Sequence, residues 1–214
     1  MDEDIEIINT NTRNEKIKNF FLYNKKKLIT FLVIIILLLC GYFLYEDFKS
    51  KKKEDIANKY NQAVIKHDLG QKENIGNTLK EIIDTKDNTY APLAFFFLLD
   101  NDLISSKEEI NKYFDIIINE IGLDKENKNL TIFKKGLFNS DFANENEMLK
   151  ILNPVINSKS IWKPHALYLM AEYYFAKNEK IKSKEFLDQL VSLENINSKI
   201  KIEAQKRLSA DFSE

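Results

Sequence analysis

The chain has 214 residues, of which 44% are hydrophobic, with 32 basic and 33 acidic side chains and a formal net charge of −1. The 5 glycines and 3 prolines are too few for turn-dense all-β folds, and a single cysteine excludes an internal disulfide and any zinc site built on paired cysteines. The balanced charge argues against a nucleic-acid-binding protein, which would have a strongly basic face. The composition therefore predicts a mostly helical protein.

One stretch near the N-terminus is long and apolar enough to cross a membrane. Residues 28–45 read LITFLVIIILLLCGYFLY and carry no charge. A membrane helix needs about 20 apolar residues, with about 17 as the lower limit, so this segment can span a bilayer. Lysines precede it at 25–27, and Tyr42, Phe43 and Tyr45 lie at its other end, where they suit the membrane interface. We predict a polar N-terminal segment over 1–27, a transmembrane helix over 28–45 and a charged helix or linker over 46–53.

Two other interpretations of residues 28–45 fit less well. A cleaved signal peptide would have a shorter leader than the residues before Leu28, and small residues at a cleavage site, which do not follow Gly41. A buried core helix is seldom apolar on all sides over such a length. A retained anchor is therefore the preferred interpretation. Its orientation stays open, because cations flank the segment in nearly equal number and the positive-inside rule depends on a clear difference.

Residues 54–214 have the periodicity of amphipathic helices and predict an all-α domain. Apolar side chains recur there at spacings of three and four residues, which places them on one face of a helix. Short polar stretches separate these segments, and no alternating run is long enough for a strand. The clearest groups are Ile56, Tyr60, Ala63 and Val64; Leu79, Ile82 and Ile83; Ile110, Phe114, Ile117 and Ile121; and Met148, Leu149, Leu152 and Ile156.

Residues 164–195 resemble one tetratricopeptide repeat, a helix–turn–helix unit of 34 residues. Asn178 stands where the turn usually has glycine, and asparagine adopts the left-handed conformation at modest cost. The residues at the packing positions of the two helices are Leu167, Met170, Ala171, Tyr174, Ser183, Leu187 and Leu190. The unit departs from the usual pattern at Ser183, at Leu190 and at Asn195, where alanine, alanine and proline are common.

The same template, moved towards the N-terminus, predicts further repeats. It aligns the close-packing position at Ala171 with Gly136, Leu98 and Ala63. The matching second helices are expected at 145–157, 107–120 and about 73–83, and a helix over 198–209 would cap the open end. The predicted fold is all-α: a single N-terminal transmembrane helix followed by a tetratricopeptide-like α-solenoid of about four helical hairpins and a capping helix, over 54–214.

This alignment also predicts a peptide groove. The first helices of tetratricopeptide arrays line a concave face, and the template position that points into it is aromatic in every unit: Tyr60, Phe95, Phe133 and Tyr168. Neighbouring groove positions are Val64, Leu99, Leu137, Glu172 and Phe175, with His165 in the first turn of the last unit. We expect a mostly apolar groove for an extended or helical apolar peptide. The alternatives are that these rings fill the core, or that the protein's own helices occupy the groove.

The sequence contains no evident catalytic arrangement. His67 and His165 lie in different units, and Cys40 lies in the predicted anchor. Neither a Gly-x-Ser-x-Gly turn nor a glycine-rich phosphate loop is present. Paired glutamates fall at predicted helix starts, where acids complement the helix dipole. We expect a protein that is not an enzyme, with no cofactor, metal, nucleic acid or small-molecule substrate.

The order of these segments resembles the ancillary SecYEG translocon subunit (YfgM-like) family, whose repeat domain is related to the cell-division coordinator CpoB. The residues that carry the resemblance are the anchor at 28–45, NTYAPLA at 88–94, and Trp162 with HALYLMAE at 165–172. Members of the family usually end this last stretch in Gly-Asp or Gly-Glu, where this chain has Ala171 and Glu172.

The resemblance implies a bacterial inner-membrane protein that crosses the membrane once, with a cytoplasmic N-terminus and a periplasmic repeat domain. It also implies translocon subunits and a periplasmic prolyl-isomerase chaperone as partners, and a role in assisting exported proteins. Two alternatives stay open, namely a scaffold in envelope growth or cell division and a membrane adaptor that faces the cytosol.

Overall fold

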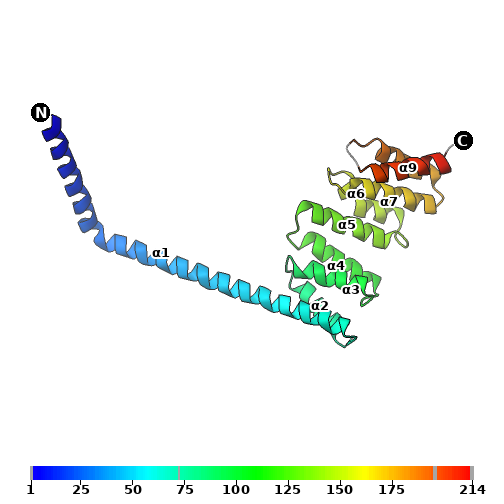
Figure 1. The fold of residues 1–214 in the computed structure, drawn as a ribbon, viewed down its shortest axis with the longest axis horizontal. Coiled ribbons are helices and arrows are strands. Elements are labelled where there is room, and N and C mark those ends of the chain that lie inside the picture. The colour runs from blue at the N-terminus through cyan, green and yellow to red at the C-terminus, as the bar shows by residue number, and fades with distance from the viewer. Residues whose placement is uncertain (1, 72, 195–196, 213–214) are drawn as a thin grey trace. The chain divides into compact units, whose positions relative to one another are not determined.

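The computed structural model describes residues 2–71, 73–194 and 197–212, with side chains from residue 15 onwards. All nine regular elements within these ranges are α-helices (Figure 1), so the predicted fold class is confirmed. The chain divides into two compact units, Met1–Asp55 and Ile56–Glu214. The first unit contains most of one long helix, and the second contains the repeats.

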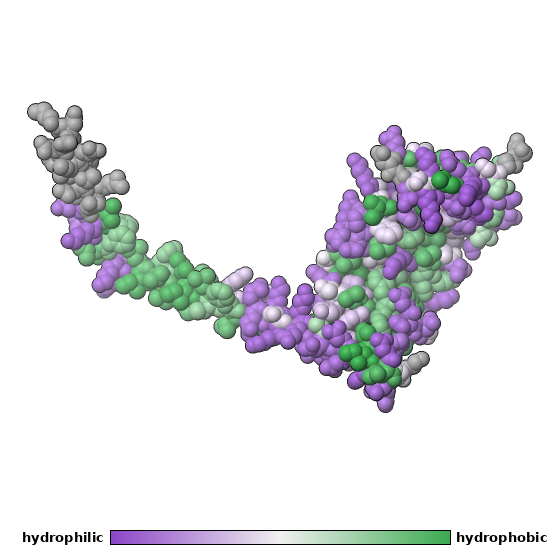
Figure 2. Space-filling model, viewed as in Figure 1, coloured by the Kyte–Doolittle hydropathy of each residue, from purple (hydrophilic) through white to green (hydrophobic). Residues whose placement is uncertain are grey.

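Helix α1 (Asp2–Asp68) runs without a break through the predicted anchor and the predicted linker. Its large apolar side chains between Ile29 and Leu44 are 37–72% exposed, and Figure 2 shows them as a continuous hydrophobic band with hydrophilic residues on either side. Within the part of the chain that the structure describes, α1 is the one helix with the length and apolar content to cross a membrane. A core helix would be covered by protein, so the core-helix interpretation of this segment is wrong.

The second unit consists of successive helix pairs. The end of α1 from Ile56 onwards precedes α2 (Ile75–Asp84), and α3 (Tyr90–Asp100) precedes α4 (Lys107–Asn119). The next pairs are α5 (Lys125–Asn139) with α6 (Glu145–Ile156), and α7 (Lys163–Ala176) with α8 (Lys180–Val191). Helix α9 (Ser198–Asp211) follows. The predicted second helices and the cap agree with these bounds to within about two residues, and Figure 1 shows the helices of this unit stacked in chain order.

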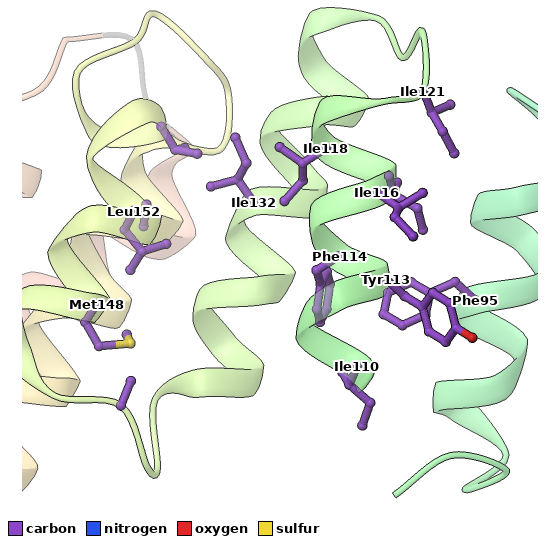
Figure 3. Packing of buried hydrophobic residues seen from close by; sticks show 14 of the residues in the cluster. Phe95, Ile110, Tyr113, Phe114, Ile116, Ile118, Ile121, Ile132, Met148 and Leu152 are labelled. Atoms are coloured by element: carbon purple, nitrogen blue, oxygen red, sulfur yellow. The ribbon is translucent and has the colours of Figure 1, made fainter. Parts of the chain in front are cut away.

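The core of the second unit confirms the predicted alignment of the repeats. The four close-packing positions, Ala63, Leu98, Gly136 and Ala171, are all buried. Figure 3 shows how α3, α4, α5 and α6 contribute apolar side chains to one continuous core, including Phe95, Phe114 and Leu152. Three of these four residues, Ala63, Gly136 and Ala171, are small and allow the paired helices to approach closely, because interiors leave few voids.

Local sequence signals define the helix ends. Ser106 and Asn144 cap α4 and α6 by accepting hydrogen bonds from the backbone N–H groups of Glu109 and Glu147. Asn178 has a φ of 62°, and the N–H of the next residue donates to the carbonyl of Tyr174 at 2.9 Å. This arrangement is the Schellman ending of a helix, and it confirms the left-handed turn predicted from the asparagine.

Candidate peptide-binding face

Aromatic ring contacts join α1 to α3, and α5 to the start of α7. Tyr60 of α1 contacts Tyr90 and Phe97 of α3, with ring centroids 5.8 and 6.3 Å apart. Phe133 of α5 stacks on Trp162, at the start of α7, with centroids 5.9 Å apart and an interplanar angle of 18°. All these rings are half-buried. Two of the four predicted aromatic groove positions therefore lie in these contacts and keep part of their surface accessible.

Phe95 contradicts the prediction that all four aromatic positions line a groove. Its side chain is 0% exposed and packs edge-to-face on Phe114 of α4, with centroids 4.7 Å apart. Helix α3 buries Ala91, Ala94, Phe95 and Leu98, a stripe with helical spacing. The sequence of α3 is apolar on nearly all sides, so periodicity could not identify the buried side. Leu93 of α3 is not one of the predicted groove residues, yet its large apolar side chain is 45% exposed.

The other predicted groove residues of the first three units have different degrees of exposure. Leu137 of α5 is 54% exposed, so its side chain is available to a ligand. Val64 of α1 and Leu99 of α3 are half-buried, and Leu99 packs against the core. The face is therefore most accessible on α5, around Phe133 and Leu137.

Helix α9 covers part of the predicted groove on α7. The carboxylate of Glu172 accepts two hydrogen bonds from the guanidinium of Arg207, at 2.9 and 3.0 Å. The same guanidinium lies 4.6 Å from the ring centroid of Phe175, which also contacts Phe212. Burial and the charge of Glu172 raise the pKa of Tyr168. Tyr168, Glu172 and Phe175 thus face a helix of the same chain, as the alternative of an internally occupied groove predicted.

A hollow of about 890 Å³ lies beside the first turn of α7, and it is lined by residues 158–165 together with Leu193, Glu194, Asn197 and Ile200. Half-buried Trp162 and His165 line it together with Ile161, which is 69% exposed. The Nδ1 atom of His165 is buried and has no hydrogen-bond partner among the described residues. A polar atom buried without a partner costs free energy, so this histidine lowers the local stability of the wall of the hollow.

Glu126 holds this hollow in shape. Its carboxylate accepts hydrogen bonds from Ser160 Oγ at 2.6 Å and from the backbone N–H of Ile161 at 3.3 Å. The segment that carries Ile161 and Trp162 is therefore fixed to the first turn of α5. In the sequence, Trp162 contributes only to a family resemblance. The signal that it belongs to the face is its ring contact with Phe133, which requires the fold.

The accessible side chains of this face suit contacts with apolar groups. Among the residues that the structure describes, no group of three His, Cys, Asp or Glu side chains could hold a metal ion. The accessible side chains are aromatic, aliphatic or an imidazole, and they lie on α5, in the turn before α7 and in the first turn of α7. The stacked helix pairs and this face define a protein-interaction domain of the tetratricopeptide-like class.

Comparison with known proteins supports this class. The sequence of residues 18–109, from α1 to the start of α4, matches the family described as a tetratricopeptide repeat-like domain. No curated protein and no solved structure matches the chain. The chain therefore contains a tetratricopeptide-like domain, which implies protein partners, and the stacked pairs up to α9 extend the array beyond the matched residues.

Proposed function

We propose that this protein is a membrane-anchored, non-enzymatic module that binds apolar segments of other proteins through the accessible part of its aromatic face. The main support for this proposal is that Leu137 and Ile161 are exposed beside the half-buried rings of Phe133 and Trp162. Folded domains seldom expose contiguous apolar groups that they do not use. The uncovered apolar part of α1 supports anchoring in a membrane.

We further propose that the protein is a periplasmic accessory of the secretion translocon that works with a prolyl-isomerase chaperone. This assignment is supported by the resemblance in the order of segments, namely one anchor followed by a tetratricopeptide-like domain. A tethered binding face next to the membrane would hold exported chains as they emerge, before their apolar residues are buried. A scaffold in cell division and an adaptor that faces the cytosol are the competing assignments.

The binding role can be tested with fluorescently labelled peptides that tile exported proteins. Replacing Phe133 and Leu137 together by alanine should weaken the binding of apolar peptides several-fold, because both side chains are accessible on α5. The matched control replaces Ile181 and Ile202, which are also exposed but lie on α8 and α9. Equal loss in both double variants, or no loss in either, would contradict binding at this face.

The location requires a separate experiment in whole cells. With Cys40 replaced by serine and a cysteine introduced at the exposed loop residue Ser105, a thiol reagent that cannot cross the inner membrane should label a periplasmic domain. Extraction in mild detergent should then recover translocon subunits and a prolyl isomerase. Division proteins among the partners would favour the scaffold, whereas absence of labelling with cytosolic partners would favour the adaptor.

A further inference from the structure

The two ends of the apolar stretch of α1 differ in charge. Residues 16–27, on its N-terminal side, contain five lysines and no carboxylate. Residues 46–55, on its C-terminal side, contain four lysines and four carboxylates, and Lys51 pairs with Asp47 at 2.7 Å. The N-terminal side of the proposed anchor therefore has uncompensated positive charge, whereas the charges on the C-terminal side cancel.

The five lysines of residues 16–27 are free to meet an external partner. All are exposed, and among the residues that the structure describes none lies within ion-pair distance of a carboxylate. Glu15 is the carboxylate next to the segment in sequence, and the acids before it lie at residues 2–6. Those acids are ten or more residues from Lys16, or about 15 Å along a helix, which exceeds the Debye length of about 8 Å at physiological salt. The acidic start of the chain therefore leaves the positive charge of this segment largely intact.

Apolar side chains of the same segment gather on one face of the helix. Ile17, Phe20 and Phe21 are separated by three and four residues, the spacing of a single helical face. Leu28, at the start of the apolar stretch, continues this face seven residues after Phe21. The side chains of Ile17, Phe20 and Phe21 are 48–57% exposed, so the protein itself does not cover them.

Lysines border this apolar face on both sides. With about 3.6 residues per turn, Lys18 and Lys25 lie along one edge of the face, and Lys16 and Lys27 lie along the other. A lysine stem can lie on apolar surface while its ammonium group reaches outwards to a phosphate. An apolar face bordered by lysines is typical of helices that lie in the interface of an anionic membrane.

We propose that residues 16–27 bind the surface of an anionic bilayer, with the apolar face among the upper acyl chains and the lysines on lipid phosphates. The inference rests on the proposed anchoring of α1 in a membrane. As a helix the segment is about 18 Å long, whereas the headgroup layer is about 5–8 Å thick. Helix α1 therefore bends near Lys27, and the segment continues along the membrane surface. The protein would be held by one helical segment across the membrane and one upon it, and would gather anionic lipid around its anchor.

The test uses the full chain reconstituted into bilayers of phosphatidylcholine and phosphatidylglycerol, of which the second is anionic. Electron paramagnetic resonance of spin-labelled lipids measures how strongly each lipid associates with the protein. The natural protein should prefer phosphatidylglycerol by about threefold or more at low salt, because each lysine near the surface attracts anionic lipid. This preference should decrease at high salt.

Two triple variants separate the site from the net charge. Replacing Lys25, Lys26 and Lys27 by glutamine should remove most of the preference for phosphatidylglycerol. The matched control replaces by glutamine three exposed lysines of the repeats and should keep the preference: Lys128, Lys180 and Lys184. Circular dichroism should confirm that both variants are folded. Equal losses in the two variants would overturn the proposal.

A second measurement tests whether the segment lies along the surface. In a Cys40→Ser background, Phe21→Cys places a fluorescent label on the apolar face, and Asn19→Cys places it on the opposite face. The label at position 21 should be quenched by nitroxides near the top of the acyl chains, and the label at position 19 by iodide in the water. Equal access of iodide to both labels would contradict the surface helix.

Failure of the anchoring and failure of this inference give different results. Release of the full chain from the bilayer by alkaline extraction would refute the anchoring, and the inference with it. A chain that stays in the bilayer without preferring phosphatidylglycerol would refute the inference alone. In that case the lysines would face water or an acidic segment of another protein.

Discussion

Gly136 of α5 lies so close to Leu152 of α6 that a Cβ atom at Gly136 would stand 2.5 Å from a methyl carbon of Leu152. Real Cβ atoms do not approach other atoms so closely, so the side chain of Leu152 would have to leave its packed position if any larger residue replaced Gly136. The third repeat therefore depends on glycine at the position where the last repeat has Ala171. This contact also sets how α5 is presented between α4 and α6.

Gly136→Ala should lower the free energy of unfolding by about 1–3 kcal/mol, because Leu152 must leave its packed position. Urea unfolding followed by circular dichroism measures the change. Gly76→Ala in α2 is the matched control, since the nearest atom to its added Cβ, the carbonyl oxygen of Leu103, is 3.7 Å away. That control should be neutral or stabilising by up to about 1 kcal/mol. Equal destabilisation by both changes would contradict the close packing at Gly136.

The buried and exposed apolar residues of the first helices should respond differently to truncation. Phe95→Ala should cost about 3–5 kcal/mol of stability, because it leaves a cavity against Phe114. Leu137→Ala should cost less than about 0.5 kcal/mol, since more than half of its side chain is already in water. Thermal or urea unfolding distinguishes the two. A small loss of stability in Phe95→Ala would mean that Phe95 is accessible and belongs to the face that binds peptides.

The contact between Arg207 and Glu172 should control how firmly α9 is attached. Among the described residues of α9 only Ala204 is fully buried, while Ile200, Leu208 and the following Phe212 pack on the core with part of their surface exposed. Arg207→Ala should cost about 1–2 kcal/mol locally, because it removes two charge-assisted hydrogen bonds and the contact with Phe175. Hydrogen exchange should accelerate in α9 and remain unchanged in α3 and α4. Arg207→Lys should give an exchange rate in α9 between those of the natural protein and of Arg207→Ala, because lysine keeps the charge but cannot form the bidentate contact.

Acid should weaken the ion pairs that close the gaps between the second helices. Hydrogen bonds from Lys80 to Glu109, and from Lys182 and Tyr174 to Glu145, lower the pKa values of both carboxyls below their usual 4.5. A lowered pKa in the folded state means that this stabilisation is present above about pH 4.5 and is lost as the pH falls through the folded-state values. The urea concentration at the midpoint of unfolding should therefore decrease as the pH is lowered from 4.5.

The double variant Glu109→Gln, Glu145→Gln identifies the source of this acid sensitivity. It should be less stable than the natural protein at pH 7 and should lose less stability on acidification, because neither side chain titrates. Urea midpoints at pH 7 and pH 3 provide the comparison. An unchanged acid response in the variant would assign the loss to other carboxyls of the chain.

The turn between α7 and α8 should become more stable with glycine at position 178. Asn178→Gly removes the residual strain of a left-handed residue and should raise the melting temperature, with a gain of up to about 1 kcal/mol. Asn178→Val should lower stability by about 1–2 kcal/mol, because a branched Cβ disfavours this conformation most. Differential scanning calorimetry of the two variants gives opposite shifts if the positive φ is the cause.

The sequence by itself determined the local structure of this protein. Amphipathic spacing identified α2, α4 and α6, because each has one apolar stripe and a polar remainder. The uncharged stretch at 28–45 predicted a helix that is not covered by protein, and small residues such as Ala63 and Gly136 aligned the repeats. Asn178 predicted the left-handed turn between α7 and α8, since that conformation depends on this residue and its immediate neighbours.

Only the tertiary structure decided which surfaces remain free. Helix α3 is apolar on nearly all sides, so only its packing against α2 and α4 shows that Phe95 is buried and Leu93 is exposed. The attachment of α9 to Glu172 and the hydrogen bond from Asn111 of α4 to Asn139 of α5 join side chains that are 35 and 28 residues apart in the chain. These side chains meet because of how the helices stack, and the periodicity of any single helix cannot specify that stacking.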